Sequence, residues 1–177
     1  GSIRPARGLE DFILAAQILS SSNPDLYFVV AGSIDPGMHP YFNSLMALVA
    51  NASLSDRFVW LGAISESSMA WCYTNCELFL MTSRSEACPN VVLESLAYGS
   101  IVVSTEADPM PEFYDNVAFY YRRSDPVSLK FALDESLSLT VSERSRRSSY
   151  AKLLASRYTW SKTAEALLAH FERVKSL

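Results

Sequence analysis

The chain has 177 residues, 49% of them hydrophobic and 19% charged, which is the composition of an ordinary globular domain with room for a sizeable core. With 15 Lys and Arg against 19 Asp and Glu, the net charge of −4 excludes a general nucleic-acid-binding surface, but it leaves room for a local basic pocket. No apolar run approaches the roughly 20 residues of a membrane-spanning helix.

In chain order, the first two thirds of the sequence alternate between helix and strand patterns. The segment GLEDFILAAQILSSSNP has apolar residues on one helical face, and Pro24 ends that helix. The continuous apolar run DLYFVVAG predicts a strand buried on both faces, as in parallel sheets. The later segments predict a helix in MHPYFNSLMALVANA, a strand in RFVWLG, a helix opened by Ser65 in SESSMAWCYTN, a strand in CELFLMT, a helix in PNVVLESLAYG, a strand in SIVVS and a fifth strand in VAFYY.

From residue 126 onward the pattern predicts helices alone, at about residues 126–139, 142–158 and 159–174. The last helix carries an apolar side that includes Trp160, Leu167 and Phe171. Strands that alternate with helices predict an α/β fold, a doubly wound parallel sheet flanked by helices. The chain shows no repeat, low-complexity tract or linker, so residues 1–177 are predicted to form one domain that ends with the helices of about residues 142–175.

The stretch SEACPNVVLES contains two glutamates eight positions apart, Glu86 and Glu94. In open parallel sheets, ligands bind beyond the carboxyl ends of the strands, and this stretch follows such an end. Pro89 favours a helix start, and the first N–H groups of that helix form a site for a phosphate or another anion. Glu94 would then face a polyol such as a ribose, and Glu86 the hydroxyls of whatever the phosphate carries. Two interpretations stay open at this point, an ordinary helix start or a site for a sugar and its nucleotide.

The segment SRSEACPNVVLESLAYGSIVVST resembles the donor-site segment of the retaining glycosyltransferases of the GT-B fold, group 1 or family 4 type. Their signature is a glutamate, seven residues, a second glutamate, a helix end of small residues, a glycine and an apolar strand. GSIRPARGLEDFILAA is similar to their phosphate-binding opening, and RYTWSKTAEALLAHFERV to their closing helix. The resemblance covers nearly the whole chain and implies the C-terminal, donor-binding, Rossmann-like half of a GT-B fold.

The resemblance implies a role for each matching residue. Glu94 would bind the ribose hydroxyls of a nucleoside diphosphate. Glu86 and Arg7 would be the catalytic residues, Glu86 on the donor sugar and Arg7 on the leaving diphosphate. The other residues implied in donor binding are Arg4, Gly62, Ile64, Cys88, Asn90 and Val91.

Three positions depart from the family pattern. Ser2 stands where the family usually has an arginine, for which Arg4 could substitute. The loop of residues 86–89 lacks two glycines that are common in the family, and this makes it stiffer. In ADPMPE, Asp108 and Pro109 replace a usual double glycine. The first two changes affect the parts of the chain expected to approach the donor.

The resemblance also implies the setting of the site. The donor would be a nucleoside-diphosphate sugar, and the acceptor a glycan, a lipid or a small molecule. No metal or other cofactor is expected, and no nucleic acid. The first strand of this half and the acceptor-binding N-terminal domain would precede Gly1, so the fragment alone is expected to be inactive. The protein would be cytoplasmic, or peripheral at the membrane through the other half. The alternatives are a degenerate or non-catalytic nucleotide-binding or partner-binding module, and another GT-B nucleotide-sugar enzyme such as an epimerase.

The cysteines Cys72 and Cys76 are four positions apart on a predicted helix. This spacing would suit half of a metal site, but the sequence has no second ligand pair with suitable spacing. We therefore expect both to be small buried thiols in a reducing compartment.

Overall fold

The structure is a computed structural model and describes residues 1–87 and 89–175. Its strands are β1 (Phe28–Ala31), β2 (Phe58–Gly62), β3 (Phe79–Met81), β4 (Val102–Thr105) and β5 (Phe119–Tyr121). Its helices are η1 (Pro5–Arg7), α1 (Leu9–Ser20), α2 (His39–Asn51), α3 (Glu66–Asn75), α4 (Asn90–Tyr98), α5 (Met110–Tyr114), η2 (Asp115–Val117), α6 (Pro126–Leu137), α7 (Val141–Ala155) and α8 (Trp160–Lys175). The predicted alternation of strand and helix is confirmed, with boundaries that differ by a few residues.

The strands pair in parallel, as predicted, but in two separate ladders. β1 pairs with β2, and β4 lies between β3 and β5. The N-terminal segment lies between the carboxyl ends of the two ladders, because Ile3 N donates to Ser33 O (2.7 Å) after β1 and Arg84 N, after β3, donates to Ala6 O (2.8 Å). Further back, residues of β1 and β3 line an apolar cavity of about 600 Å³ instead of pairing with each other. The predicted α/β fold with parallel strands is therefore confirmed, and its strands form two ladders joined at one end by residues 1–7.

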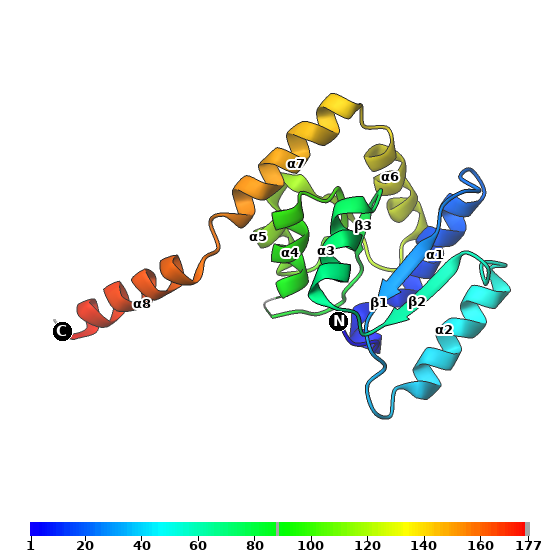
Figure 1. Ribbon diagram of the computed structural model, residues 1–177, viewed down its shortest axis with the longest axis horizontal. Coiled ribbons are helices and arrows are strands. Elements are labelled where there is room, and N and C mark those ends of the chain that lie inside the picture. Colours follow the sequence, from blue (N-terminus) through cyan, green and yellow to red (C-terminus); the bar gives the residue numbers. More distant parts are fainter. Residues whose placement is uncertain (88, 176–177) are drawn as a thin grey trace.

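The ladder β1–β2 is covered by α1 and α2 on one face and exposes Val29, Val59 and Leu61 on the other. Helices cover both faces of the ladder β3–β4–β5, which makes this part of the fold doubly wound (Figure 1). Neighbouring residues of β4 show this directly, because successive side chains of a strand point to opposite faces. Val103 packs in the apolar cluster that includes α1, α2 and α6, whereas Val102 packs in the cluster that includes α4, α5 and α7. Both side chains are fully buried, and burial of such a side chain contributes about 1.5–3 kcal/mol.

Local capping explains several helix boundaries. Ser65 is the N-cap of α3, where its side chain accepts a hydrogen bond from Ser68 N, as its place in the sequence predicts. Gly99 ends α4 with φ of 72° and also allows α7 to approach, since a Cβ at Gly99 would lie 2.2 Å from Ser148 Oγ. Both features are signals that a sequence carries by itself.

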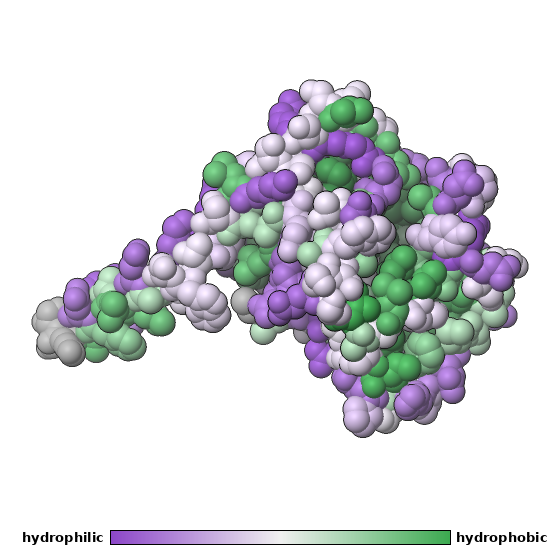
Figure 2. Space-filling view, viewed as in Figure 1, coloured by the Kyte–Doolittle hydropathy of each residue, from purple (hydrophilic) through white to green (hydrophobic). Residues whose placement is uncertain are grey.

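The last helix, α8, extends away from the rest of the chain (Figure 1). Figure 2 shows apolar residues along one side of it, and the side chains of Trp160, Leu167, Leu168 and Phe171 are all exposed. The predicted amphipathic pattern is confirmed, but its apolar side packs on nothing among the described residues. None of the described helices combines the length and the apolar character needed to cross a membrane.

Candidate functional site

A cavity of about 570 Å³ opens at the carboxyl ends of β1 and β2. Its walls are the N-terminal Gly1 and Ser2, the loops that follow β1 and β2, and one side each of α3 and α4. The side chains of Tyr73 and Glu94 face it from these two helices. The rule for open parallel sheets predicts a ligand site at this edge, and the cavity lies there.

Glu94 lies in the second turn of α4 and is held by a tyrosine from the neighbouring helix. The hydroxyl of Tyr73 on α3 donates a hydrogen bond of 2.9 Å to Glu94 Oε2. Burial raises the pKa of the Tyr73 hydroxyl, and the hydrogen bond to Glu94 raises it further, so the hydroxyl stays protonated and acts as a donor. Glu94 lines the cavity, and no donor of the described residues holds its second carboxylate oxygen, Oε1.

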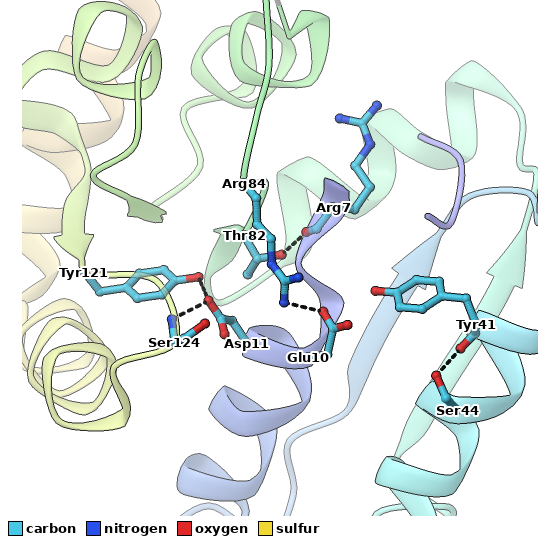
Figure 3. A network of polar contacts seen from close by, with 9 residues as sticks. All are labelled: Arg7, Glu10, Asp11, Tyr41, Ser44, Thr82, Arg84, Tyr121 and Ser124. Carbon is cyan, nitrogen blue, oxygen red and sulfur yellow. Dashed lines mark hydrogen bonds and ion pairs between the residues drawn. The ribbon is translucent and has the colours of Figure 1, made fainter. Parts of the chain in front are cut away.

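Arg7 is positioned by the tight turn of η1. Thr82 Oγ1 donates to the carbonyl of Arg7 (2.8 Å) from the end of β3 (Figure 3). Gly8 follows with φ of 59°, and a Cβ there would lie 2.2 Å from Thr82 O, so only glycine allows this approach. The turn therefore ties the backbone of Arg7 to the third strand and leaves its side chain free to point elsewhere.

A polar network holds the start of α1, directly after this turn (Figure 3). The buried Asp11 accepts hydrogen bonds from the hydroxyl of Tyr121 (3.2 Å) and from Ser124 N (3.1 Å), and Arg84 forms an ion pair with Glu10 (2.9 Å). The network joins α1 to the ends of β3 and β5. Sequence reasoning did not find Asp11, although a carboxylate within the apolar segment EDFILAA is a signal that could have shown it.

The guanidinium of Arg7 points away from this network (Figure 3). It forms an ion pair with the carboxylate of Glu86. Its Nη2 lies 3.3 Å from the point where a Cβ on Gly1 would stand, and Gly1 in turn lines the cavity that contains Glu94. Burial lowers the pKa of Arg7, and the charge of Arg4 lowers it further, but a guanidinium stays charged. Arg7 Nε is buried and has no hydrogen-bond partner among the described residues. A cation with an unused donor therefore lies beside the cavity.

The N-terminus of α4 adds further donors. Pro89 is the N-cap residue, and it forms no side-chain cap hydrogen bond. The first N–H groups of the helix, from Asn90 and Val91, therefore lack the capping acceptor that a Ser or Asp would supply. Such a helix start favours an anion.

The structure gathers most, but not all, of the predicted donor residues. Gly62, Ile64, Val91 and Glu94 line the cavity, and Arg7 and Glu86 pair next to it. Arg4 and Asn90 are exposed and line neither of the two cavities described above, because Arg4 is turned outward at the start of η1 and Asn90 at the start of α4. Cys88 lies outside the described residues. Tyr73 was not predicted, because nothing in its local sequence indicates which carboxylate it contacts.

The cysteines differ from expectation. Cys72 is half-buried and Cys76 is exposed, so neither is the fully buried thiol that the sequence suggested. The reason is that α3 buries only Tyr73 and leaves its other positions partly or fully open to solvent. Within the described part of the chain, no group of three or more His, Cys, Asp and Glu side chains could hold a metal ion.

Comparison with known proteins shows the family to which the chain belongs. The sequence profile of the family "Glycosyl transferases group 1" matches residues 1–154. This chain belongs to the group 1 glycosyltransferases. The match covers both ladders of the sheet and nearly all of α7, whereas α8 lies beyond it.

Curated relatives of this group 1 chain are distant in sequence. The GPI3 subunit of phosphatidylinositol N-acetylglucosaminyltransferase from Saccharomyces cerevisiae is 22% identical over 177 residues, which cover 99% of this chain and 38% of the relative. A phosphatidylinositol N-acetylglucosaminyltransferase subunit from Arabidopsis thaliana is 26% identical over 152 residues, or 85% of this chain and 32% of the relative. The chain therefore spans about two fifths or less of the length of these relatives.

Solved structures of the family share the fold. The isolated C-terminal domain of the group 1 glycosyl transferase LpcC from Francisella tularensis has a TM-score of 0.76 and 23% identity, over 89% of this chain and 82% of that one. HepE from Anabaena, in complex with UDP, has a TM-score of 0.81 and 21% identity, over 100% of this chain and 47% of that one. At these identities the similarity shows the GT-B Rossmann-like fold alone.

Proposed function

We propose that this chain is the donor-binding part of a glycosyltransferase that takes a sugar from a nucleoside-diphosphate sugar and transfers it, with retention, to an acceptor. One observation carries the proposal. The cavity at the carboxyl ends of β1 and β2 has a carboxylate on its wall, Glu94, and a cation beside it, Arg7. A nucleoside diphosphate combines a vicinal diol with a double negative charge, and these two groups complement it.

The nucleoside would occupy the cavity itself. Glu94 would accept hydrogen bonds from the two ribose hydroxyls, which a carboxylate does well because both oxygens are acceptors. The base would lie against residues 62–64, where Gly62 turns the chain with φ of 65° and leaves the surface open.

The diphosphate would interact with Arg7 and with the N-terminus of α4. Breaking the bond between the sugar C1 and the diphosphate oxygen builds negative charge on the leaving group. Stabilisation of that charge by fixed donors is a large term in catalysis, and loss of one such donor typically costs about 10²- to 10³-fold in rate. Arg7 suits this role because its buried Nε has no partner among the described residues.

Glu86 would bind hydroxyls of the donor sugar once Arg7 turns to the diphosphate. The new bond would join the sugar C1 to an acceptor oxygen, and the proton of the acceptor hydroxyl would pass to the leaving diphosphate oxygen. The acceptor would be a glycan, a lipid or a small molecule bound by the longer protein. Two relatives are named phosphatidylinositol N-acetylglucosaminyltransferase subunits, and this favours a lipid acceptor at a membrane surface. No metal or cofactor forms part of the proposal.

Titration with UDP tests the proposal, since UDP is the nucleotide held by a structural neighbour. We expect the chain to bind UDP saturably by calorimetry and to transfer no sugar alone. Glu94→Ala should weaken UDP binding about 10- to 100-fold, the equivalent of charge-assisted hydrogen bonds worth about 1.5–3 kcal/mol. Glu135→Ala, which removes an exposed glutamate on α6, is the matched control and should bind as the wild type does. A flat titration with UDP and the other nucleoside diphosphates would refute the proposal and favour a module without nucleotide binding.

A further inference from the structure

We propose that Tyr73 is a positioning residue for nucleotide binding, which fixes the carboxylate of Glu94 in the orientation that receives the ribose hydroxyls. The inference rests on the proposed function of the cavity and adds a residue to it. It starts from one contact, the 2.9 Å hydrogen bond from the Tyr73 hydroxyl to Glu94 Oε2.

Tyr73 is itself firmly held, which a positioning residue must be. Only 3% of it is exposed. Its ring stacks on Tyr98 with 5.7 Å between centroids and 12° between planes, and meets the edge of Phe79 at 5.4 Å. Its carbonyl accepts a hydrogen bond from Ser100 Oγ (3.0 Å), so both its backbone and its ring are fixed.

Glu94, by contrast, has little else to hold it. It is exposed on α4, and the structure gives its carboxylate no other hydrogen-bond or ion-pair partner among the described residues. A free glutamate of this kind samples several rotamers, and ligand binding must then oppose the loss of that freedom. The hydroxyl of Tyr73 selects one rotamer before the ligand arrives.

The Tyr73 hydroxyl is also chemically suited to orient the Glu94 carboxylate. A tyrosine hydroxyl is neutral, so it orients the carboxylate without cancelling its charge, as an arginine or lysine would. The hydroxyl bonds Oε2 alone, so Oε1 of Glu94, a residue that lines the cavity, has no donor among the described residues. Burial raises the pKa of the hydroxyl, so it remains a donor across the physiological range.

The test is Tyr73→Phe, which keeps the ring and removes the donor. We expect the affinity for UDP to fall about three- to tenfold, the effect of releasing one immobilised side chain. The affinity for 2′,3′-dideoxyuridine diphosphate, which lacks both ribose hydroxyls, should stay unchanged. A purely structural role for Tyr73 would weaken both ligands alike, and that result would overturn the inference, as would unchanged binding of UDP.

Two further variants test whether the effect of Tyr73→Phe is specific to its contact with Glu94. Tyr150→Phe is the matched control. The Tyr150 hydroxyl also donates to a carboxylate, that of Asp115 (2.9 Å), but this pair lies away from the cavity. Loss of this hydroxyl should therefore leave UDP binding intact. In a Glu94→Ala background, Tyr73→Phe should cause no further loss, because the carboxylate that Tyr73 positions is gone. An additional loss in that background would overturn the inference while wild-type UDP binding still upheld the proposed function. If the wild-type chain bound no UDP, both would be refuted together.

Discussion

The ion pair between Arg7 and Glu86 gives the sharpest prediction about the site. Both residues are expected to act on the donor, yet in the structure each neutralises the other. The diphosphate must therefore compete with Glu86 for the guanidinium. Replacement of Glu86 by glutamine removes the competing charge and keeps the shape of the side chain, so we expect Glu86→Gln to bind UDP more tightly than the wild type.

The magnitude follows from the burial of the pair. The side chain of Arg7 is 23% exposed and that of Glu86 is 10% exposed. Exposed pairs contribute about 0.2–1 kcal/mol, and loss of one partner from a fully buried pair costs about 3–5 kcal/mol. This pair, which is mostly but not fully buried, lies between the two cases, at about 1–2 kcal/mol. Since about 1.4 kcal/mol is tenfold in affinity, UDP should bind the variant about 5- to 30-fold more tightly.

Calorimetric titration of UDP and UDP-glucose measures the effect. UDP-glucose should gain less than UDP, because the variant also loses the carboxylate that would meet the sugar. The melting temperature of the free variant should fall by about 2–4 °C for each kcal/mol lost. Glu10→Gln is the matched control: it breaks the nearby ion pair with Arg84 and should lower the melting temperature without changing UDP affinity. Unchanged or weaker UDP binding by Glu86→Gln would show that the pair does not compete with the diphosphate.

Two further predictions concern the frame of the site. Gly8→Ala should destabilise the chain by about 1–3 kcal/mol and weaken UDP binding, because its Cβ would displace Thr82 O and move Arg7. Gly37 also has a positive φ, but the space around it is open, so Gly37→Ala is the control. Its melting temperature should fall because of backbone strain, while its UDP affinity in calorimetry should stay unchanged. Equal losses of UDP affinity in the two variants would contradict this reasoning. Thr140→Ala should lower the melting temperature by about 2–4 °C at pH 7 by removing the capping box of α7. The hydrogen bonds from Thr140 lower the pKa of Glu143 in the folded chain. Their contribution to folding stability is therefore fully present above the pKa of Glu143 in the unfolded chain, about 4.3, and is lost as the pH falls through its pKa in the folded chain. Melting curves at pH 7 and pH 3 should therefore show the difference shrink, and a constant difference would count against the capping box.

The parts of the fold that depend on local chemistry could be predicted from the sequence. Ser65 opens α3 and Gly99 ends α4 because a side-chain cap and a positive φ are properties of single residues. The alternation of strand and helix predicted the parallel sheet and the edge at which the cavity lies. The break between the two ladders could not be predicted, since it depends on which strands find a neighbour and not on the apolar pattern of either strand.

The side-chain contacts within the site could not be predicted from the sequence either. The family signature predicts roles for Glu86 and Glu94, but it does not indicate which residues contact them. Tyr73 lies 21 positions before Glu94 and on a different helix, and the whole first ladder stands between Arg7 and Glu86 in the sequence. A sequence states that a tyrosine or an arginine is present, whereas tertiary packing decides which carboxylate it contacts.

Those partners make the two glutamates unequal, although the signature presents them as a pair. Glu94 is held by a neutral hydroxyl, so its charge is available to a ligand from the start. Glu86 is held by a cation, so its charge is cancelled until another anion draws Arg7 away. In the proposed function this difference gives binding an order. The ribose meets a carboxylate that is already oriented, the diphosphate then takes Arg7, and only this exchange frees Glu86 for the sugar. A free sugar without its nucleotide would find Glu86 still paired and would bind poorly, which is a useful property for a site that must recognise a sugar only when it carries its leaving group.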